Sequence, residues 1–364
     1  MERTCYNEKA QNAEHDDETL REGSVLSEKA YIDVGRMDEA LALFGTFDEN
    51  AKTIEQELQV RLRTGEMQII VEGERENADL AKAVIEGLLR LLSRGEKIDK
   101  GRIRYAVDLA REGNAELIAE LGNDVVAFTH RGKQIKTKTL GQKQYVRAIQ
   151  DHTVTFGIGP AGTGKTYLAV AMAVRAFKNK QVEKIILTRP AVEAGEKLGF
   201  LPGDLQNKVD PYLRPLYDAL FEFLGPENFR TLSEKGTIEV APLAYMRGRT
   251  LNDAFIILDE AQNTSIEQMK MFLTRFGEGA RVVVTGDVTQ IDLPNGKQSG
   301  LIHAERVLQG VEGLSIIRLS HKDVVRHEMV QRIIMAYDKA EKERAERIKK
   351  TGGTLRTKKE PTNR

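Results

Sequence analysis

The chain has 364 residues, an apolar fraction of 40% and a formal net charge of zero. This length suffices for two domains or one large one, and the composition is typical of a folded globular protein. Cys5 is the only cysteine, which excludes an internal disulfide and a cysteine-based metal site. No run approaches the ~18–20 apolar residues of a membrane span, and the N-terminus lacks the apolar segment of a signal peptide. We therefore expect a cytoplasmic protein with no membrane partner.

Residues 1–35 are predicted to form a disordered acidic tail, because they are polar and lack periodicity. Residues 36–125 are predicted to form a small α+β domain with a helical linker. The predicted elements of this domain are a short strand at 41–44, a helix at 48–58, strands at 60–63 and 67–71 joined by a tight turn, a helix at 77–93 and two short helices within 98–122. Residues 341–364 are predicted to form a basic, largely disordered C-terminal tail.

Strands and helices alternate through residues 126–340, after a predicted hairpin within 125–139. The strands are predicted at 154–158, 184–188, 238–241, 255–258, 281–285 and 314–319, and the helices at 140–149, 165–177, 211–224, 265–276, 300–309 and from 325 onward; residues 190–204 are predicted to form a loop. Such alternation favours an α/β fold with a parallel sheet covered by helices on both faces. Ligands of such sheets bind at the carboxyl ends of the strands.

A glycine-rich turn separates the predicted strand at 154–158 from the Ala/Val/Leu-rich helix that follows it. The turn is Gly159-Pro160-Ala161-Gly162-Thr163-Gly164-Lys165-Thr166, which matches G-x-x-x-x-G-K-[ST] at every fixed position. Glycines let backbone N–H groups approach phosphate oxygens, and the helix N-terminus adds a favourable dipole. In this pattern Lys165 reaches the β- and γ-phosphates and the Thr166 hydroxyl holds Mg²⁺. The chain is thus predicted to bind a nucleoside triphosphate.

Two carboxylates follow the apolar strand predicted at 255–258. Hydrolysis of a phosphoanhydride needs a carboxylate near Mg²⁺ and a group that activates or orients the attacking water. We assign Asp259 to the metal and Glu260 to the water. Gln290 lies just past the end of the next strand, where it is predicted to sense the γ-phosphate or position the water. Asp287, in the same turn, is interpreted as a cap or loop residue.

Several segments occur in the order of motifs I, Ia, II and III of superfamily 1 helicases. They are FGIGPAGTGKTYLAVA at 156–171, Thr-Arg-Pro at 188–190, DEAQN at 259–263 and VTGDVTQID at 284–292. Together with GQKQY at 141–145 and SHKDVVRH at 320–327, they resemble the PhoH family of ATPases, and the resemblance covers about residues 36–340. It implies a RecA-like P-loop NTPase domain at 126–340, ATP and Mg²⁺ as cofactors, and an association with phosphate-starvation responses.

Two further features depend on this resemblance. Gln142 and Tyr145 occupy a site similar to a Q motif, which implies contact with adenine; the alternative is that both lie on a helix surface. The N-terminal unit resembles a KH-like RNA-binding module in element order. KH domains clamp nucleic acid with a GxxG loop, whereas residues 44–50 contain a single glycine and are acidic. An oligomerisation or docking module is therefore an equal alternative for this unit.

Arg326 is the candidate arginine finger or sensor, and the alternative is a surface arginine at a helix N-terminus. An arginine that reaches the transferring phosphoryl group is worth ~10³–10⁵ in rate. Superfamily 1 helicases have two nucleotide-fold halves and the second provides this arginine, whereas this chain has room for one half. We therefore expect a homo-oligomer with ATP at its interfaces, and the resemblance implies a hexameric ring.

Two functions follow from these motifs. The first is an oligomeric ATPase that moves along or remodels single-stranded RNA, which the helicase-type motifs, Arg189 and the KH-like unit favour. The second is an ATPase switch that acts on a protein partner, which the zero net charge and the acidic loop favour. The resemblance also suggests a ribosomal-RNA-processing endonuclease as a partner. A kinase for a small acceptor is disfavoured, because Gln290 and the Thr-Arg-Pro segment suit energy transduction better.

Overall fold

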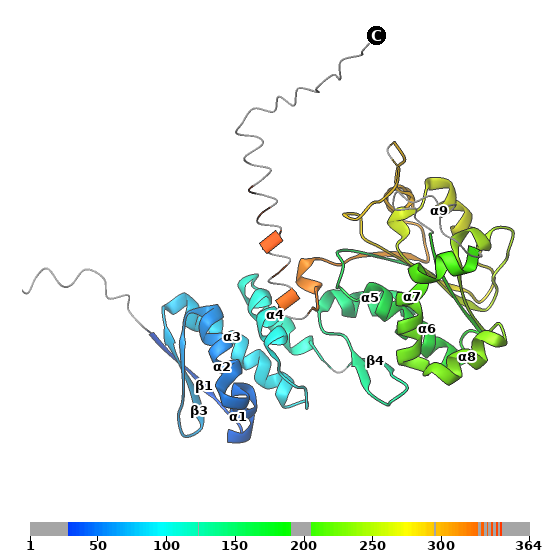
Figure 1. Cartoon of the computed structure of the whole chain (residues 1–364). Helices are drawn as coiled ribbons and strands as arrows, with labels where there is room; N and C mark the ends of the chain where they lie inside the picture. Colours follow the sequence, from blue (N-terminus) through cyan, green and yellow to red (C-terminus); the bar gives the residue numbers. More distant parts are fainter. Residues whose placement is uncertain are drawn as a thin grey trace, which may run out of the picture.

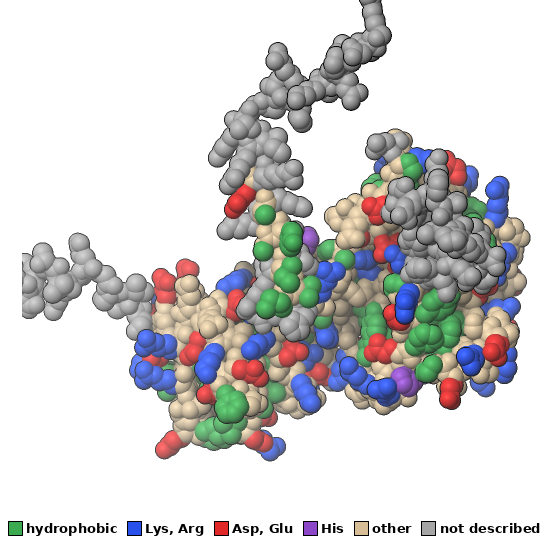
Figure 2. Space-filling view, viewed as in Figure 1, with side chains coloured by type: hydrophobic (Ala, Val, Ile, Leu, Met, Phe, Trp, Pro, Cys, Tyr) green, Lys and Arg blue, Asp and Glu red, His purple; other side chains and the backbone are tan. Residues whose placement is uncertain are grey.

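The computed structural model describes residues 28–122, 124–190, 205–294 and 296–326, with scattered positions between 329 and 343. For residues 205–212 it describes the backbone alone. Figure 1 shows an N-terminal unit, coloured blue to cyan, and a larger unit, coloured green to orange. Acidic and basic side chains are interspersed over the visible face of both (Figure 2). Across the described residues, we find no helix that is both long and apolar enough to cross a membrane.

The larger unit is built on a six-stranded sheet of order β11-β6-β10-β9-β7-β8, in which all neighbours are parallel. Its strands are β6 Val154–Ile158, β7 Lys184–Arg189, β8 Ile238–Pro242, β9 Ala254–Leu258, β10 Arg281–Gly286 and β11 Leu314–Arg318. Parallel strands covered on both faces are apolar along their length, and every residue of β6 and β9 is buried. The predicted parallel sheet is confirmed, and all six strands point their carboxyl ends to the same edge.

Helices cover both faces of this sheet. The helices are α5 Leu140–Asp151, α6 Lys165–Lys178 and α7 Leu205–Leu224 on one face, and α9 Ile266–Leu273 and α10 Gly300–Val307 on the other. Along β7, Ile185 and Leu187 join the first core and Ile186 joins the second, as the two-residue period of a strand requires. Helix α8 Pro226–Glu234 follows α7 and has no counterpart among the predicted elements.

The N-terminal unit is a three-stranded antiparallel sheet of order β1-β3-β2 with helices packed against it. Its elements are β1 Glu28–Asp33, α1 Met37–Phe44, η1 Thr46–Asp48, α2 Glu49–Leu58, β2 Arg61–Thr64, β3 Gln68–Gly73 and α3 Arg75–Leu92. Apolar residues recur at helical spacing along α3, so Ala81, Ile85 and Leu88 are fully buried. The antiparallel β2–β3 pair confirms the predicted hairpin, while the likeness to a KH module remains a resemblance.

A linker of two short helices and a hairpin joins the units, and its two helices pack on the core of the N-terminal unit and count as part of it. It comprises α4 Lys100–Arg111, η2 Ala115–Glu120, β4 Val125–Phe128 and β5 Gln134–Lys136, and it confirms the predicted break near Gly113 and the predicted hairpin. The Leu140 N–H donates a hydrogen bond of 3.0 Å to the Tyr105 hydroxyl, so α4 touches the start of α5.

Two predictions for the N-terminal unit are wrong. Residues 41–44 lie in α1 rather than in a strand, with Ala40, Leu43 and Phe44 buried at helical spacing. A run of four apolar residues is too short for its pattern to distinguish a strand from a helix. Residues 28–33, which fall within the predicted tail, form β1 and pair with β3 along their whole length. Only Ile32 of this strand is buried, which leaves the sequence pattern weak.

Several predictions concern segments outside the described residues. They are most of the loop at 190–204, the tail up to residue 27, most of the helix predicted from 325 onward and most of the C-terminal tail. Helix α7 begins at Leu205, earlier than the predicted start at 211.

Candidate functional site

The P-loop joins β6 to α6 at the carboxyl edge of the sheet. Two of its residues, Gly162 and Gly164, have φ of +87° and +81°, a left-handed conformation that glycine adopts without strain. A Cβ on Gly159 would also collide with the backbone carbonyl of Leu319. The sequence therefore needs glycine at these positions to form a tight turn at the start of α6, and a helix N-terminus is suited to bind phosphate.

A short hydrogen bond connects the P-loop to β9. The Thr166 hydroxyl donates to Oδ1 of Asp259 at 2.6 Å, and the Thr285 hydroxyl, at the end of β10, donates to the same oxygen at 2.7 Å. Asp259 is only 4% exposed, so the two hydroxyls hold its carboxylate in one orientation. The structure thus brings together the two residues that we predicted as Mg²⁺ ligands.

These oxygens fit Mg²⁺ by their chemistry. Mg²⁺ prefers hard oxygen ligands, and it is usually held by one or two carboxylates together with substrate phosphates rather than by an all-protein cage. In the described parts of the chain, no group of three or more His, Cys, Asp or Glu side chains is placed to hold a metal. Thr166 and Asp259 would therefore hold the ion only together with the phosphates of a bound nucleotide.

Glu260 lies beside Asp259 in a strained backbone conformation. Its φ is +52°, which is uncommon for a residue other than glycine and is frequently found at functional sites. Its carboxylate accepts a hydrogen bond of 2.5 Å from Nε2 of Gln262, and Arg189 at the end of β7 lies 3.4 Å from it. Arg189 also lies 3.8 Å from Oδ2 of Asp259, so one guanidinium sits against both carboxylates.

Gln262 connects the ends of β9 and β10, and we had predicted no role for it. It is 1% exposed; its Nε2 donates to the backbone carbonyl of Gln290 at 3.1 Å, and its Oε1 accepts from the N–H of Asp287 at 3.0 Å. Asp287 in turn accepts a hydrogen bond of 3.1 Å from the N–H of Ala161 in the P-loop. The only sequence signal for this network was the position of Gln262 within the DEAQN segment.

Lys165 is buried and folds back over its own loop. Its Nζ donates to the carbonyls of Gly159 at 2.6 Å and Pro160 at 2.9 Å. Burial lowers the pKa of this ammonium group below its usual value, while the nearby carboxylates, Asp287 foremost, act in the opposite direction. A phosphate anion bound in the loop would give this ammonium group an ion-pair partner in place of the two carbonyls.

A hollow of about 280 Å³ opens between these elements. It is lined by Ala161, Gly162, Gly164, Lys165, Thr166, Tyr167, Asp259, Glu260, Gly286, Asp287 and Gln290. The hollow thus brings together the predicted metal ligands, the predicted water-orienting residues and the loop lysine.

Gln142 and Tyr145 lie behind the P-loop rather than on its hollow. Gln142 is 5% exposed; its Nε2 donates to the carbonyl of Thr163 at 3.0 Å, and its Oε1 accepts from the N–H of Lys138. Tyr145 is fully buried, and its hydroxyl donates to the carbonyl of Lys165 at 3.3 Å. Burial raises the pKa of this phenol. The surface alternative is therefore wrong, and contact with adenine stays a prediction, because the contacts seen here are with the P-loop.

Arg326 lies against the P-loop of its own chain. A Cβ on Gly162 would collide with the Arg326 side chain, and the neighbouring Val325 N–H donates to the Gly162 carbonyl at 2.9 Å. This strap after β11 begins with η6 His321–Asp323. The geometry favours the sensor alternative for Arg326 over a finger that reaches a neighbouring subunit.

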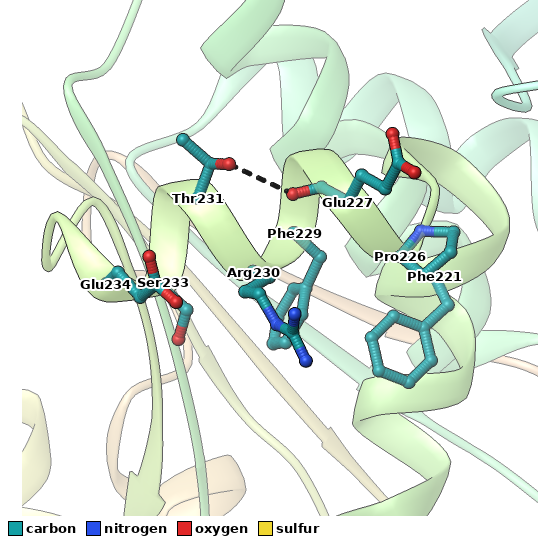
Figure 3. Close-up of a pocket in the computed structure, with 8 residues that line it drawn as sticks. All are labelled: Phe221, Pro226, Glu227, Phe229, Arg230, Thr231, Ser233 and Glu234. Atoms are coloured by element: carbon teal, nitrogen blue, oxygen red, sulfur yellow. Dashed lines mark hydrogen bonds between the residues drawn. The ribbon is translucent and has the colours of Figure 1, made fainter.

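A separate hollow of about 740 Å³ lies between α7 and α8 (Figure 3). Phe221, Phe229 and Arg230 contribute to its lining, and Figure 3 shows the Phe221 ring and the Arg230 side chain on the same side of the two helices. No P-loop residue and neither of the two carboxylates that follow β9 lines it, so it carries none of the predicted chemistry.

The six-stranded parallel sheet, its flanking helices and the phosphate loop between β6 and α6 define a P-loop protein of the RecA-like fold. A family model described as PhoH-like protein matches residues 134–338. The chain belongs to the PhoH-like protein family, a family of P-loop ATPase type.

The relatives span most of the chain. It is 53% identical to a PhoH-like protein of Bacillus subtilis (strain 168) over 302 residues, which are 83% of this chain and 95% of the relative. It is likewise 53% identical to a PhoH-like protein of Mycobacterium tuberculosis (strain ATCC 25618 / H37Rv) over 305 residues, which are 84% of this chain and 86% of the relative. It is 42% identical to Protein PhoH of Escherichia coli (strain K12) over 262 residues, which are 70% of this chain and 73% of the relative.

Proposed function

We propose that this protein binds ATP with Mg²⁺ at the P-loop and hydrolyses it. The observation that carries the proposal is the 2.6 Å hydrogen bond between Thr166 and Asp259, residues 93 positions apart in the sequence. It joins the hydroxyl of the phosphate loop to a buried carboxylate, which are the two protein ligands that P-loop enzymes use for the metal. The parallel sheet and the family membership support nucleotide binding in general.

Each residue of the hollow has a task in this proposal. Backbone N–H groups of the P-loop bind the phosphates, and Lys165 turns from the loop carbonyls to the β- and γ-phosphates. Glu260 orients and activates the attacking water, with Gln262 and Arg189 fixing its carboxylate. Gln290 and Arg326 sense the γ-phosphate. Mg²⁺, when bound, neutralises charge that develops on the phosphates.

The proposed work of this ATPase is RNA-linked, carried out by a cytoplasmic homo-oligomer. The order of the helicase-type motifs supports the RNA link, and the presence of a single nucleotide-fold unit supports assembly. The family likeness suggests a hexameric ring as the assembly and a ribosomal-RNA-processing endonuclease as the partner. The alternative is an ATPase switch for a protein partner, which the zero net charge and the acidic loop at residues 45–50 support. Both alternatives share the same hydrolytic site.

The test measures ATP hydrolysis by the wild type, by Lys165→Ala and by Lys180→Ala, with and without single-stranded RNA. Lys180 is an exposed lysine at the opposite edge of the sheet, so its variant controls for loss of a positive charge. We expect Lys165→Ala to lose ~10²–10³-fold in turnover, Lys180→Ala to keep it, and RNA to stimulate both active proteins.

Mixing the wild type with Lys165→Ala then tests assembly. If active sites depend on neighbouring subunits, wild-type activity falls out of proportion as inactive subunits are added. If RNA leaves the rate of ATP hydrolysis unchanged, the RNA-linked role is overturned and the protein-directed switch is the remaining function. Full turnover in Lys165→Ala would overturn the proposed site itself.

A further inference from the structure

A groove of about 890 Å³ lies between the N-terminal unit, the linker hairpin and the strap after β11. Its lining comes from three separate elements: the start of α4, the β4–β5 hairpin with the residues that follow it, and the segment from His321 to Arg326. The groove is therefore a joint feature of both units, and none of the motifs that define the P-loop site accounts for it.

Basic side chains dominate this groove. Of the described residues that line it, nine are Lys or Arg and three are Asp or Glu. Five of the basic side chains pair with acidic ones: Arg102 and Lys136 with Glu96, Lys100 with Glu49, Arg104 with Glu57, and Lys322 with Glu112. These pairs hold the walls together but leave the groove with an excess of positive charge.

Besides Arg326, three lysines carry this excess. Lys97, Lys133 and Lys138 are exposed, and among the residues that the structure describes none of them has an ion-pair partner. They belong to the N-terminal unit, the hairpin and the segment before α5, and all three line the same groove. In Figure 2, basic side chains are visible in the region between the two units. An excess of positive charge along one groove creates a site for a polyanion.

The groove also reaches the P-loop through the strap. Arg326 lines the groove at one end and packs against Gly162. The strap is anchored by Asp323, whose carboxylate accepts a hydrogen bond of 2.8 Å from the Ser320 N–H and lies where a Cβ on Gly141 would stand. A ligand that moves the strap would therefore change the surroundings of the phosphate loop.

We infer that this groove binds the phosphate backbone of single-stranded RNA, and that the strap transmits its occupancy to the P-loop. The inference rests on the proposed RNA-linked function and gives that function a location, away from the acidic loop at residues 45–50. A positively charged groove that follows the backbone is the common device of proteins that bind single strands without sequence preference.

The experiment reverses the charge of the three lysines together (Lys97→Glu, Lys133→Glu, Lys138→Glu). The matched control carries Lys180→Glu, Lys184→Glu and Lys235→Glu, three exposed lysines near the amino ends of β7 and β8. Binding of fluorescent single-stranded RNA is measured over a salt series. Each lost phosphate contact lowers the slope of log affinity against log salt by about 0.7, so we expect the slope to fall by about 2 and the affinity roughly tenfold or more.

The control variant should bind RNA like the wild type, and both variants should keep ATP affinity and hydrolysis in the absence of RNA. A second set, with glutamine in place of the three lysines, should show the same slope change without charge reversal and guards against misfolding. RNA should stimulate hydrolysis in the control and not in the groove variants.

Each failure has a distinct meaning. If the wild type binds RNA and the groove variants bind it equally well, the groove is not the site, while the RNA-linked function stands. If the wild type binds no RNA at any salt concentration, both fail. If polyglutamate displaces RNA at equal charge, the groove is a docking site for an acidic protein. If the groove variants lose ATP affinity, the groove belongs to the nucleotide site, and the inference is overturned.

Discussion

The two units of this protein treat buried polar groups in opposite ways. At the carboxyl edge of the large sheet, Asp259, Gln262 and Asp287 are buried and bonded to one another's strands and to the P-loop. In the N-terminal unit, the buried Asn50 and Thr53 donate to the backbone carbonyls of Ile98 and Glu49 and tie together parts of the fold. Buried polar networks are costly unless every member is paired. The larger unit is therefore organised around a chemical site. The N-terminal unit is organised around an apolar core, and its function lies on its surface.

The largest effect that sharpens this contrast should come from Glu260→Gln. The substitution keeps the shape of the side chain but removes its ability to take a proton, and general-base catalysis is typically worth ~10²–10⁴-fold. We expect turnover to fall by that factor while ATP affinity is kept. Glu278→Gln, at an exposed carboxylate outside the hollow, is the control. Unchanged turnover in Glu260→Gln would assign water activation to another group.

The core of the N-terminal unit should respond in stability and not in chemistry. Leu88 is fully buried, and Leu88→Ala should lower the free energy of unfolding by about 2–5 kcal/mol through lost burial and the cavity that remains. Leu41→Ala, at a side chain that is 64% exposed, should change it by less than about 0.5 kcal/mol. Thermal unfolding measures both. At temperatures where the unit stays folded, ATP hydrolysis without RNA should match the wild type; a loss of hydrolysis there would show that the units are not independent.

The sequence predicts the large sheet well because its signals are local. Strands β6 and β9 are fully buried and apolar, and the glycines of the P-loop satisfy a conformation that other residues resist. The mostly exposed edge strand β1 lacks such a signal, since only its pairing with β3 reveals it. Helix α1 shows the same limit, because burial on one side of a helix and burial in a short strand give similar four-residue patterns.

Within the site, the sequence predicts which residues stand at strand ends but not what they touch. Asp259 and Glu260 follow a recognisable strand, whereas the contacts of Gln262 and Arg189 with these carboxylates depend on how β7, β9 and β10 are ordered. The placement of Arg326 against its own P-loop depends on the strap after β11, whose path no local pattern specifies.

Gln142→Ala tests whether this residue supports the P-loop or reads the base. Its amide is buried and bonded to the carbonyl of Thr163 and the N–H of Lys138. Removing a buried partner leaves these groups unsatisfied, at a cost of about 1–3 kcal/mol in stability. We expect weaker binding of ATP and of GTP by the same factor, measured by calorimetry, with a lower melting temperature. A selective loss of ATP over GTP would instead confirm the predicted contact with adenine.

A smaller effect should appear in the proton balance of nucleotide binding. In the free protein, burial lowers the pKa of Lys165 below its ordinary value of 10.5. In alkaline buffer, a fraction of the molecules therefore carries a neutral amine at this position. Phosphate anions favour the charged form, so binding should take up protons in that pH range. Calorimetry in buffers of different ionisation enthalpy measures this uptake. It should vanish in Lys165→Arg, which stays charged throughout; uptake that persists would point to another group.

The smallest expected effect concerns strain in the N-terminal unit, where no chemistry explains it. Phe47 has φ of +54° and is 88% exposed, so an unfavourable backbone presents an aromatic ring to solvent. Asparagine tolerates the left-handed region, and Phe47→Asn should stabilise the unit by about 1 kcal/mol. Phe47→Ala removes the ring but keeps the strain, so it should not stabilise. If both variants weaken RNA binding or assembly, the ring is a contact residue and the strain serves to present it. If neither does, the surface function of this unit does not depend on this ring.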